Sequence, residues 1–397
     1  MVEPALGAVA GLAPDREGIP ALRAVELTKH FPVRQRGRGS GLDRSRRSRV
    51  VHAVDSVSVE LWAGQVTAVV GESGSGKSTL ARLLARLVTP TSGRLLLETS
   101  EVAGSARGAR QYRRTVQLIL QDPFSSLNPV HDVGYHLARP LLVHRLTRRG
   151  ADTDREVARL LERVELSPAA RYVDKLPHEL SGGQLQRVAI ARCLAVRPRI
   201  LLADEPVSML DVSIRIGILN LLEDLSRADG LATLYVTHDI ASARYLATTI
   251  LVMYAGQIVE SGPSEAVTDR PAHPYTQLLL SATADPERAP MPPALTAAGA
   301  PPSLIDPPGG CRFHPRCPHA MPVCAEQAPP RVEVLPGQHA SCWLHVPGHP
   351  DLPLGKPPAS RTGAEPLAGG SQPRSAAKPS ELRDRAQNRD RPRKETR

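Results

Sequence analysis

A glycine-rich segment in the first quarter of the chain has the residue types and spacing that hold phosphate groups. It matches the pattern G-x-x-x-x-G-K-[ST] and reads Gly71, Glu72, Ser73, Gly74, Ser75, Gly76, Lys77, Ser78, Thr79. Its glycines let backbone N–H groups approach a phosphate chain, Lys77 adds a positive charge, and the Ser78 hydroxyl suits Mg²⁺. A flexible glycine- and serine-rich linker is the alternative interpretation. An apolar run before the segment and a helical pattern after it favour the phosphate site.

Two adjacent acids further along the chain supply a second part of such chemistry. Asp204 and Glu205 follow the apolar run Ile200–Ala203. A phosphate-binding α/β fold places its Mg²⁺-associated aspartate at the end of a buried strand. We therefore expect Asp204 to bind Mg²⁺, directly or through water, and Glu205 to take a proton from an attacking water.

The elements that must position these residues alternate between strands and helices. Apolar or alternating runs predict strands at 22–27, 57–61, 66–70, 116–120, 200–203, 234–237 and 250–254. Helical patterns begin near Lys77 and recur at 156–164, 184–195 and 214–226. This alternation predicts a parallel α/β sheet. Helical signals predominate over 124–194, which predicts an all-α insertion.

Five separated segments together resemble the ABC ATPase family over about residues 22–283. They contain the glycine-rich loop, Gln121 in LILQDP, the run Leu180, Ser181, Gly182, Gly183, Gln184, the acids Asp204 and Glu205 with Asp211 shortly after, and His238 in YVTHD. The resemblance implies a P-loop NTPase core with an antiparallel β subdomain and the helical insertion. It also implies that ATP and Mg²⁺ are bound and that ATP is hydrolysed.

The same resemblance implies roles for the residues outside the loop. Gln121 would sense Mg²⁺ and the attacking water, and His238 would contact the γ-phosphate. Residues 181–184 would reach the γ-phosphate held by an opposite subunit, while Asp211 would cross the interface between the two subunits. Phe31 is our candidate for the aromatic side chain that stacks on adenine.

Longer matches point to the dipeptide/oligopeptide importer branch of that family. They are QDPFSSLNP at 121–129, DEPVSMLDVS at 204–213 and HPYTQLL at 273–279. The valine and serine after Asp-Glu-Pro resemble the second of the two paired ATPases in this branch, although Met209 stands where alanine is usual. The implied function is ATP-driven uptake of di- or oligopeptides. Nickel, sugars or another small solute are alternatives, because related members move them.

The C-terminal part contains four of the five cysteines, namely Cys311, Cys317, Cys324 and Cys342. They lie among prolines with little apolar periodicity, so we expect an irregular extension that needs a staple. Their spacing lacks the close pairs that are usual in zinc sites. The branch resemblance implies a [4Fe–4S] cluster here; zinc and free thiols are the alternatives. Cys193, which lies in a predicted helix, is interpreted as a packed thiol.

Composition divides the chain further. We expect a flexible leader at 1–21, the ATPase domain at 22–283, the cysteine-containing extension at 284–345 and a disordered basic tail at 346–397. The formal net charge of +10 is concentrated in that tail and in the basic loop 34–49, and these segments read as solvated.

The charge admits a soluble ABC ATPase that acts on nucleic acid or ribosomes as a rival interpretation, but neither tandem cassettes nor long coiled coils are recognisable. We therefore expect no nucleic-acid partner. No apolar run reaches the roughly 18–20 residues of a membrane span, which predicts a peripheral protein on the cytoplasmic face of the membrane. The implied partners are a paralogous ATPase, two transmembrane permeases bound near 121–135 and, indirectly, an extracytoplasmic solute-binding protein.

Overall fold

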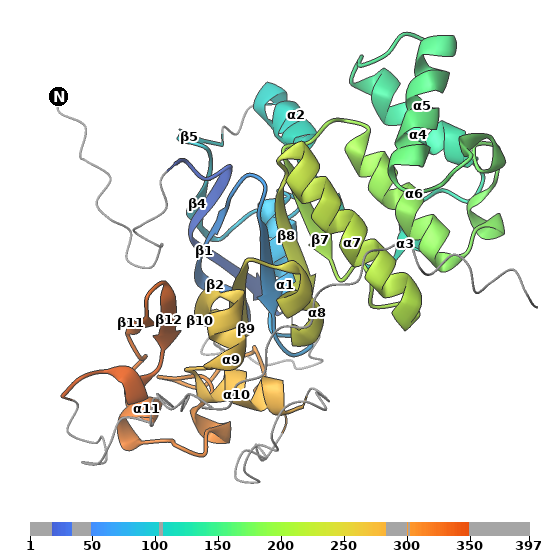
Figure 1. The fold of residues 1–397 in the computed structure, drawn as a ribbon. Coiled ribbons are helices and arrows are strands. Elements are labelled where there is room, and N and C mark those ends of the chain that lie inside the picture. Colours follow the sequence, from blue (N-terminus) through green and yellow to red (C-terminus); the bar gives the residue numbers. More distant parts are fainter. Residues whose placement is uncertain (1–17, 34–48, 103–105, 283–299, 301, 349–397) are drawn as a thin grey trace, which may run out of the picture. The chain divides into compact units, whose positions relative to one another are not determined.

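The computed structural model describes residues 18–33, 49–102, 106–282, 300 and 302–348. Most of the predicted leader, the predicted basic loop and nearly all of the predicted tail lie outside these residues. Within them the chain forms two sheets with helices packed on them (Figure 1).

The larger sheet has eight strands in the order β11-β12-β10-β9-β3-β8-β7-β6. Its strands are β3 (Val66–Val70), β6 (Val116–Ile119), β7 (Ile200–Asp204), β8 (Ala232–Thr237), β9 (Thr249–Tyr254), β10 (Gln257–Pro263), β11 (Arg331–Leu335) and β12 (Gln338–Ser341). The strands from β9 to β6 run parallel. Every residue of β3, β7 and β8 is buried, as expected for apolar strands covered on both faces. The predicted parallel α/β sheet is confirmed.

The smaller sheet is antiparallel and has the order β2-β1-β4-β5. It consists of β1 (Leu22–Pro32), β2 (Val50–Leu61), β4 (Ser92–Leu97) and β5 (Ser100–Glu101). This sheet is the antiparallel β subdomain that the resemblance implied. The sequence analysis did not predict β4 and β5, because the apolar run of β4 is limited to Leu95–Leu97 after three exposed residues and β5 is exposed throughout.

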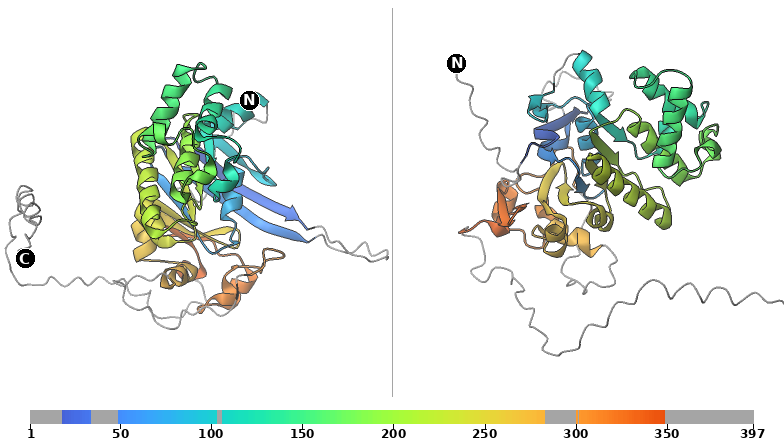
Figure 2. Two further views of the ribbon diagram at one scale, coloured as in Figure 1. Left: turned by 90° about the vertical axis from the view of Figure 1, so that its right-hand side faces the viewer. Right: turned by 45° about the horizontal axis from the view of Figure 1, so that its top comes forward.

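Helices alone make up the segment that was predicted as an all-α insertion. It contains α3 (Pro123–Ser126), α4 (Val133–Val143), α5 (Ala151–Arg163) and α6 (Gly182–Leu194), drawn in green in Figures 1 and 2. The side chain of Asp132 caps α4 by accepting a hydrogen bond from the Tyr135 N–H at 2.6 Å. Val157, Leu160 and Leu161 of α5 are buried, so the 3.6-residue period identified a face that does pack.

The remaining helices surround the two sheets and the C-terminal part. They are α1 (Lys77–Leu84), α2 (Ala106–Thr115), α7 (Val212–Asp229), α8 (Ile240–Leu246), α9 (Ser264–Asp269), α10 (Pro274–Ser281) and α11 (Pro322–Glu326). Among the described residues, none of these helices combines the length and the apolar character that crossing a bilayer requires.

The C-terminal extension is more regular than predicted. Around its cysteines it is irregular, but β11 and β12 form a hairpin that continues the larger sheet beyond β10. Phe313 is 1% exposed and lies against the rings of Tyr254 and Tyr275 at centroid distances of 5.3 and 5.5 Å. The segment therefore packs into the core of the preceding domain, a long-range contact that apolar periodicity does not reveal. Whether it also needs a staple stays a prediction.

Candidate functional site

The glycine-rich loop lies between β3 and α1, and two of its glycines are required by close backbone packing. A Cβ atom on Gly71 would lie 2.1 Å from the Met253 carbonyl oxygen, and one on Gly76 would lie 2.1 Å from the Ala53 carbonyl oxygen. The φ angle of Gly76 is 106°, a conformation that side chains disfavour. The loop can therefore wrap tightly at the start of α1, where backbone N–H groups favour a bound anion.

Lys77, Ser78 and Asp204 form the floor of the loop. The Lys77 ammonium donates hydrogen bonds to the carbonyl oxygens of Gly71 and Glu72, both at 2.8 Å. Burial lowers the pKa of Lys77, although the carboxylates of Glu205, Asp204 and Glu72 oppose that shift. The Ser78 hydroxyl donates to Asp204 Oδ1 at 2.8 Å. Burial raises the pKa of Asp204, and the Ser78 hydrogen bond opposes that shift.

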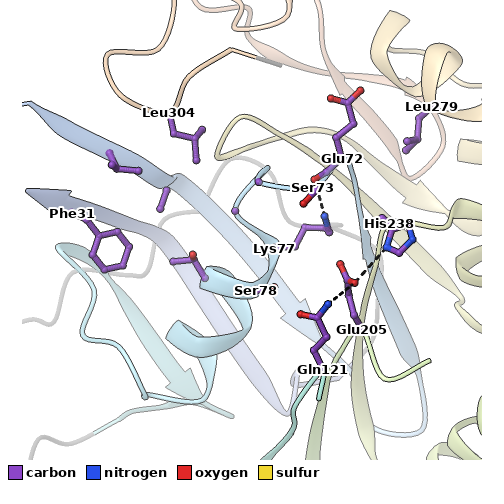
Figure 3. Close-up of a pocket in the computed structure, with 15 residues that line it drawn as sticks. Phe31, Glu72, Ser73, Lys77, Ser78, Gln121, Glu205, His238, Leu279 and Leu304 are labelled. Atoms are coloured by element: carbon purple, nitrogen blue, oxygen red, sulfur yellow. Dashed lines mark hydrogen bonds and ion pairs between the residues drawn. The ribbon is translucent and has the colours of Figure 1, made fainter. Parts of the chain in front are cut away.

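Three more of the predicted site residues meet beside this floor. Gln121, Glu205 and His238 follow β6, β7 and β8, and the carboxyl ends of these parallel strands share one edge of the sheet. Gln121 Nε2 donates to Glu205 Oε2 at 3.2 Å, and His238 Nδ1 lies 3.4 Å from the same oxygen. Figure 3 shows Glu205 between the other two side chains. The arrangement can orient a water molecule next to a carboxylate base.

The pocket above the floor is lined by loop residues with Gln121, Glu205 and His238. Apolar side chains from several segments also line it: Phe31, Val51, Ala53, Leu279 and Leu304. Phe31 lies on the side of the pocket away from His238 (Figure 3). Its ring also lies 5.0 Å from the Lys29 ammonium.

The run 181–184 and Asp211 do not line this pocket. Ser181 instead caps α6, because its hydroxyl accepts the Gln184 N–H at 3.3 Å and the Gln184 side chain accepts the Ser181 N–H at 3.1 Å. Gly183 packs against Ile214 so closely that a Cβ atom would approach Ile214 Cγ2 to 2.5 Å. The structure therefore places the N-terminus of α6 next to α7, which begins directly after Asp211.

The sequence analysis missed contacts that the C-terminal part makes with the loop. The Glu72 N–H donates to the Tyr275 hydroxyl at 2.8 Å, and the Glu72 carboxylate pairs with Arg316. Leu279 and Leu304 come from the same part of the chain. The HPYTQLL match included Tyr275 and Leu279, but no pattern linked Arg316 or Leu304 to a loop more than 200 residues earlier.

The four cysteines of the extension line one small cavity, which they share with His273, Pro274, Phe313, His314, His319, Trp343 and Leu344. None of the four forms a disulfide bond. Burial raises the pKa of Cys317 to about 11 and that of Cys342 to about 12. Cys193 lies elsewhere, buried in α6 with its thiol 3.6 Å from the Leu118 carbonyl oxygen, which agrees with its interpretation as a packed thiol.

Two protein families match the chain by sequence. The family described as ABC transporter matches residues 54–208, and the family described as oligopeptide/dipeptide transporter, C-terminal region, matches residues 259–324. A "Probable peptide ABC transporter ATP-binding protein" of Sinorhizobium fredii is 42% identical over 333 residues, which cover 82% of this chain and 90% of that protein. This chain is an ABC transporter ATP-binding protein of the oligopeptide/dipeptide branch.

Further comparisons agree with this membership. The di/tripeptide transport ATP-binding protein DppF of Pseudomonas aeruginosa is 41% identical over 322 residues, covering 81% of the present ATP-binding protein and 96% of DppF. Among solved structures, a dimeric ATP-binding cassette in a post-hydrolysis state with ADP and phosphate matches with a TM-score of 0.51 and 28% identity. That match covers 61% of this chain and 98% of the other. The chain is thus an ATP-hydrolysing subunit of an ABC transporter, and its family works with membrane permeases.

Proposed function

We propose that this subunit hydrolyses ATP at the pocket of Figure 3 to drive the uptake of di- or oligopeptides. One observation supports the catalytic part of this proposal: Gln121 and His238 both contact the Glu205 carboxylate. They do so beside the glycine-rich loop at 71–79, called the phosphate loop from here on. In this proposal Glu205 takes the proton of the attacking water, Gln121 orients that water and Mg²⁺, and His238 contacts the γ-phosphate.

The remaining loop and floor residues would bind MgATP. Backbone N–H groups of residues 71–79 would hold the phosphates, with the Lys77 charge beside them. Ser78 and Asp204 would bind Mg²⁺, which would also provide the positive charge that the buried Asp204 carboxylate favours. Phe31 would stack on the adenine.

We propose further that residues 181–184 and Asp211 act on ATP bound to a second ATPase subunit. Their separation from the pocket of their own chain supports this, because the N-terminus of α6 is an anion site without a base of its own. The matched cassette is dimeric. The resemblance to the second of two paired ATPases favours a paralogue as the partner.

The proposed transport cycle needs a surface for the permeases. Phe124, Val130 and Tyr135 lie in the segment that follows Gln121, and they are 58%, 77% and 42% exposed. Exposed apolar side chains that gather in one patch mark interaction surfaces. Here they would hold a cytoplasmic helix of a permease, which would keep the subunit at the cytoplasmic face of the membrane. An extracytoplasmic solute-binding protein would deliver the peptide.

For the four cysteines we propose a [4Fe–4S] cluster. Among the described residues, one group of three side chains has all its candidate metal-ligand atoms within 4.8 Å of one another, and it consists of His30, His52 and Asp55. No three sulfur atoms of the four extension cysteines therefore lie this close together. One tetrahedral zinc ion requires sulfur–sulfur distances of about 3.8 Å. A four-iron cluster binds each thiolate to a different iron and so suits a wider arrangement. The cluster would cross-link the cavity.

The function is tested by rebuilding the transporter in proteoliposomes with its permeases, partner ATPase and solute-binding protein. A mixture of dipeptides and tripeptides should stimulate ATP hydrolysis, and labelled dipeptide should accumulate in the lumen only when ATP is supplied. Nickel or a sugar stimulating hydrolysis instead of peptides would contradict the peptide assignment. Stimulation by DNA or ribosomes without the permeases would contradict the transport function.

The cluster is tested separately by anaerobic purification. A broad absorption band near ~400 nm with four iron and four sulfide per chain is expected. Replacing Cys324 by serine should lower the iron content, whereas Cys193→Ser should not. A colourless protein with one zinc per chain would contradict the cluster.

A further inference from the structure

The loop between Cys311 and Cys317 carries two arginines that reach the ATPase domain. Arg316 Nη1 and Nη2 contact the two carboxylate oxygens of Glu72, each at 3.0 Å. The Arg316 side chain is 9% exposed, and Nη1 also donates to the Tyr254 hydroxyl at 3.3 Å. A two-pronged arginine–carboxylate contact fixes direction as well as distance. The pair is therefore a specific link between the extension and the phosphate loop.

Glu72 is held from three sides. Its N–H donates to Tyr275, its carbonyl oxygen accepts from Lys77, and its carboxylate pairs with Arg316. In Figure 3 the Glu72 carboxylate points away from Lys77 and Ser78. Arg316 thus both neutralises this carboxylate and directs it away from the place where the phosphates would bind.

The neutralisation of Glu72 by Arg316 affects ATP binding through electrostatic repulsion. ATP brings several negative charges to a loop that already contains a carboxylate. Without Arg316, Glu72 would be an uncompensated negative charge in that loop. At the edge of a protein such a repulsion weakens binding by about tenfold.

The second arginine holds the support of the loop. Arg312 donates to the Ala255 carbonyl oxygen and pairs with Asp55. The next residue, Gly256, donates its N–H to the Ser75 carbonyl oxygen at 2.8 Å and accepts the Asp55 N–H at 2.8 Å. Residues 311–317 of the extension therefore contact both the phosphate loop, through Arg316, and the neighbouring backbone at Ala255, through Arg312.

That segment is itself fixed at both ends by the cysteine cavity. Cys311 and Cys317 line the cavity, and the Cys311 N–H donates to the Cys324 carbonyl oxygen at 2.8 Å. We propose that residues 311–317 clamp the phosphate loop through the Arg316–Glu72 ion pair. As a result, the affinity for nucleotide and the accessibility of the cysteine thiols in the cavity depend on each other. Arg316 is a positioning residue in this scheme. The inference rests on the proposed role of the phosphate loop in ATP binding.

The test is a double-mutant cycle on the full-length chain, measured as the equilibrium dissociation constant of a fluorescent ATP analogue with Mg²⁺. Arg316→Gln should raise this constant about tenfold. Adding Glu72→Gln to it should recover most of that loss, because no unpaired carboxylate remains. Arg331→Gln is the matched control: Arg331 is an extension arginine that bonds Ser261 instead of the loop, and its loss should leave the constant unchanged.

Arg316→Lys provides a second variant, since Arg316 is nearly buried and its loss could affect folding. Lysine keeps the charge but not the two-pronged contact, so an intermediate affinity is expected. Unchanged affinity in R316Q and R316K, or a double variant no better than R316Q, would overturn the clamp. Lys77→Ala separates this failure from a failure of the proposed function: normal binding in K77A would contradict the loop assignment itself.

Coupling between two sites is reciprocal, which gives a readout independent of hydrolysis. In the full-length chain as purified, with any bound metal left in place, alkylation of the extension cysteines is followed by mass spectrometry with and without MgATP. Nucleotide should slow the alkylation of Cys317 in the wild-type chain and fail to do so in R316Q. Equal protection in both chains, or none in the wild type, would contradict the coupling.

Discussion

At the scale of single residues, the site depends on one carboxylate whose two neighbours come from different strands. Glu205 has a φ angle of 48°, a left-handed conformation that is unfavourable for a glutamate. Its N–H donates to the Val236 carbonyl oxygen at 2.9 Å, so the bend is held by β8. The bend places the carboxylate where Gln121 and His238 reach it, which links the strained backbone to the proposed general base.

Replacing Glu205 by glutamine tests this. The amide keeps the size of the side chain but cannot take a proton, so the rate of ATP hydrolysis should fall by about 10²–10⁴-fold while ATP still binds. The measurement is phosphate release by the assembled transporter together with ATP affinity. Glu162→Gln, on the exposed face of α5, is the control. A rate within twofold of the wild type would refute the assignment of Glu205.

At the scale of elements, a buried amide adds to the strand pairing that attaches the hairpin β11–β12 to the ATPase domain. Gln338 is 0% exposed, and its Nε2 donates to Glu260 Oε1 at 2.7 Å and to the Arg270 carbonyl oxygen at 2.9 Å. Glu260 also accepts the N–H groups of Ala272 and His273, both at 2.9 Å. This network joins β12, β10 and the start of α10, the helix that presents Tyr275 to the phosphate loop.

Gln338→Ala should therefore lower the free energy of unfolding by about 1–3 kcal/mol, because buried acceptors lose their donor. The measurement is urea unfolding of the full-length chain. The control is Gln327→Ala, since Gln327 is exposed in the same extension and its loss should cost less than about 0.5 kcal/mol. Equal stability of the two variants would show that the hairpin is held by other contacts.

At the scale of the whole molecule, the proposed active site is divided between two subunits. Ser181 and Asp211 lie outside the pocket of their own chain, and Gly183 packs closely on Ile214, which holds the N-terminus of α6 against α7. Closing the site on ATP would therefore require a second subunit to present the same pair of segments.

In the Glu205→Gln background, MgATP should drive association of this chain with its partner ATPase, and adding Ser181→Arg should abolish it. The arginine would block the approach to the partner's nucleotide without touching the chain's own pocket. Light scattering measures association, and the affinity of each separate chain for ATP should stay unchanged. ADP in place of ATP is the control. Association that persists in the Ser181→Arg variant would contradict the shared site.

Local patterns in the sequence were enough to predict the parts of this protein that depend on neighbouring residues alone. Strand β3, the glycine-rich loop and the start of α1 could be predicted because their hydrophobic period and glycine spacing are local properties. The acids at the end of β7 were found for the same reason. The site residues outside the loop were proposed from resemblance, and the structure brings Gln121, Glu205 and His238 together at one edge of the sheet.

The contacts of the C-terminal part became visible only in the folded chain. The pairing of β12 with β10, the packing of Phe313 on Tyr254 and Tyr275, and the Arg316–Glu72 ion pair join residues 38 to 244 positions apart. No local period or spacing encodes such contacts, because they depend on where the larger sheet ends and which of its surfaces remain uncovered. For that reason the cysteines could be counted from the sequence, whereas their connection to the phosphate loop required the fold.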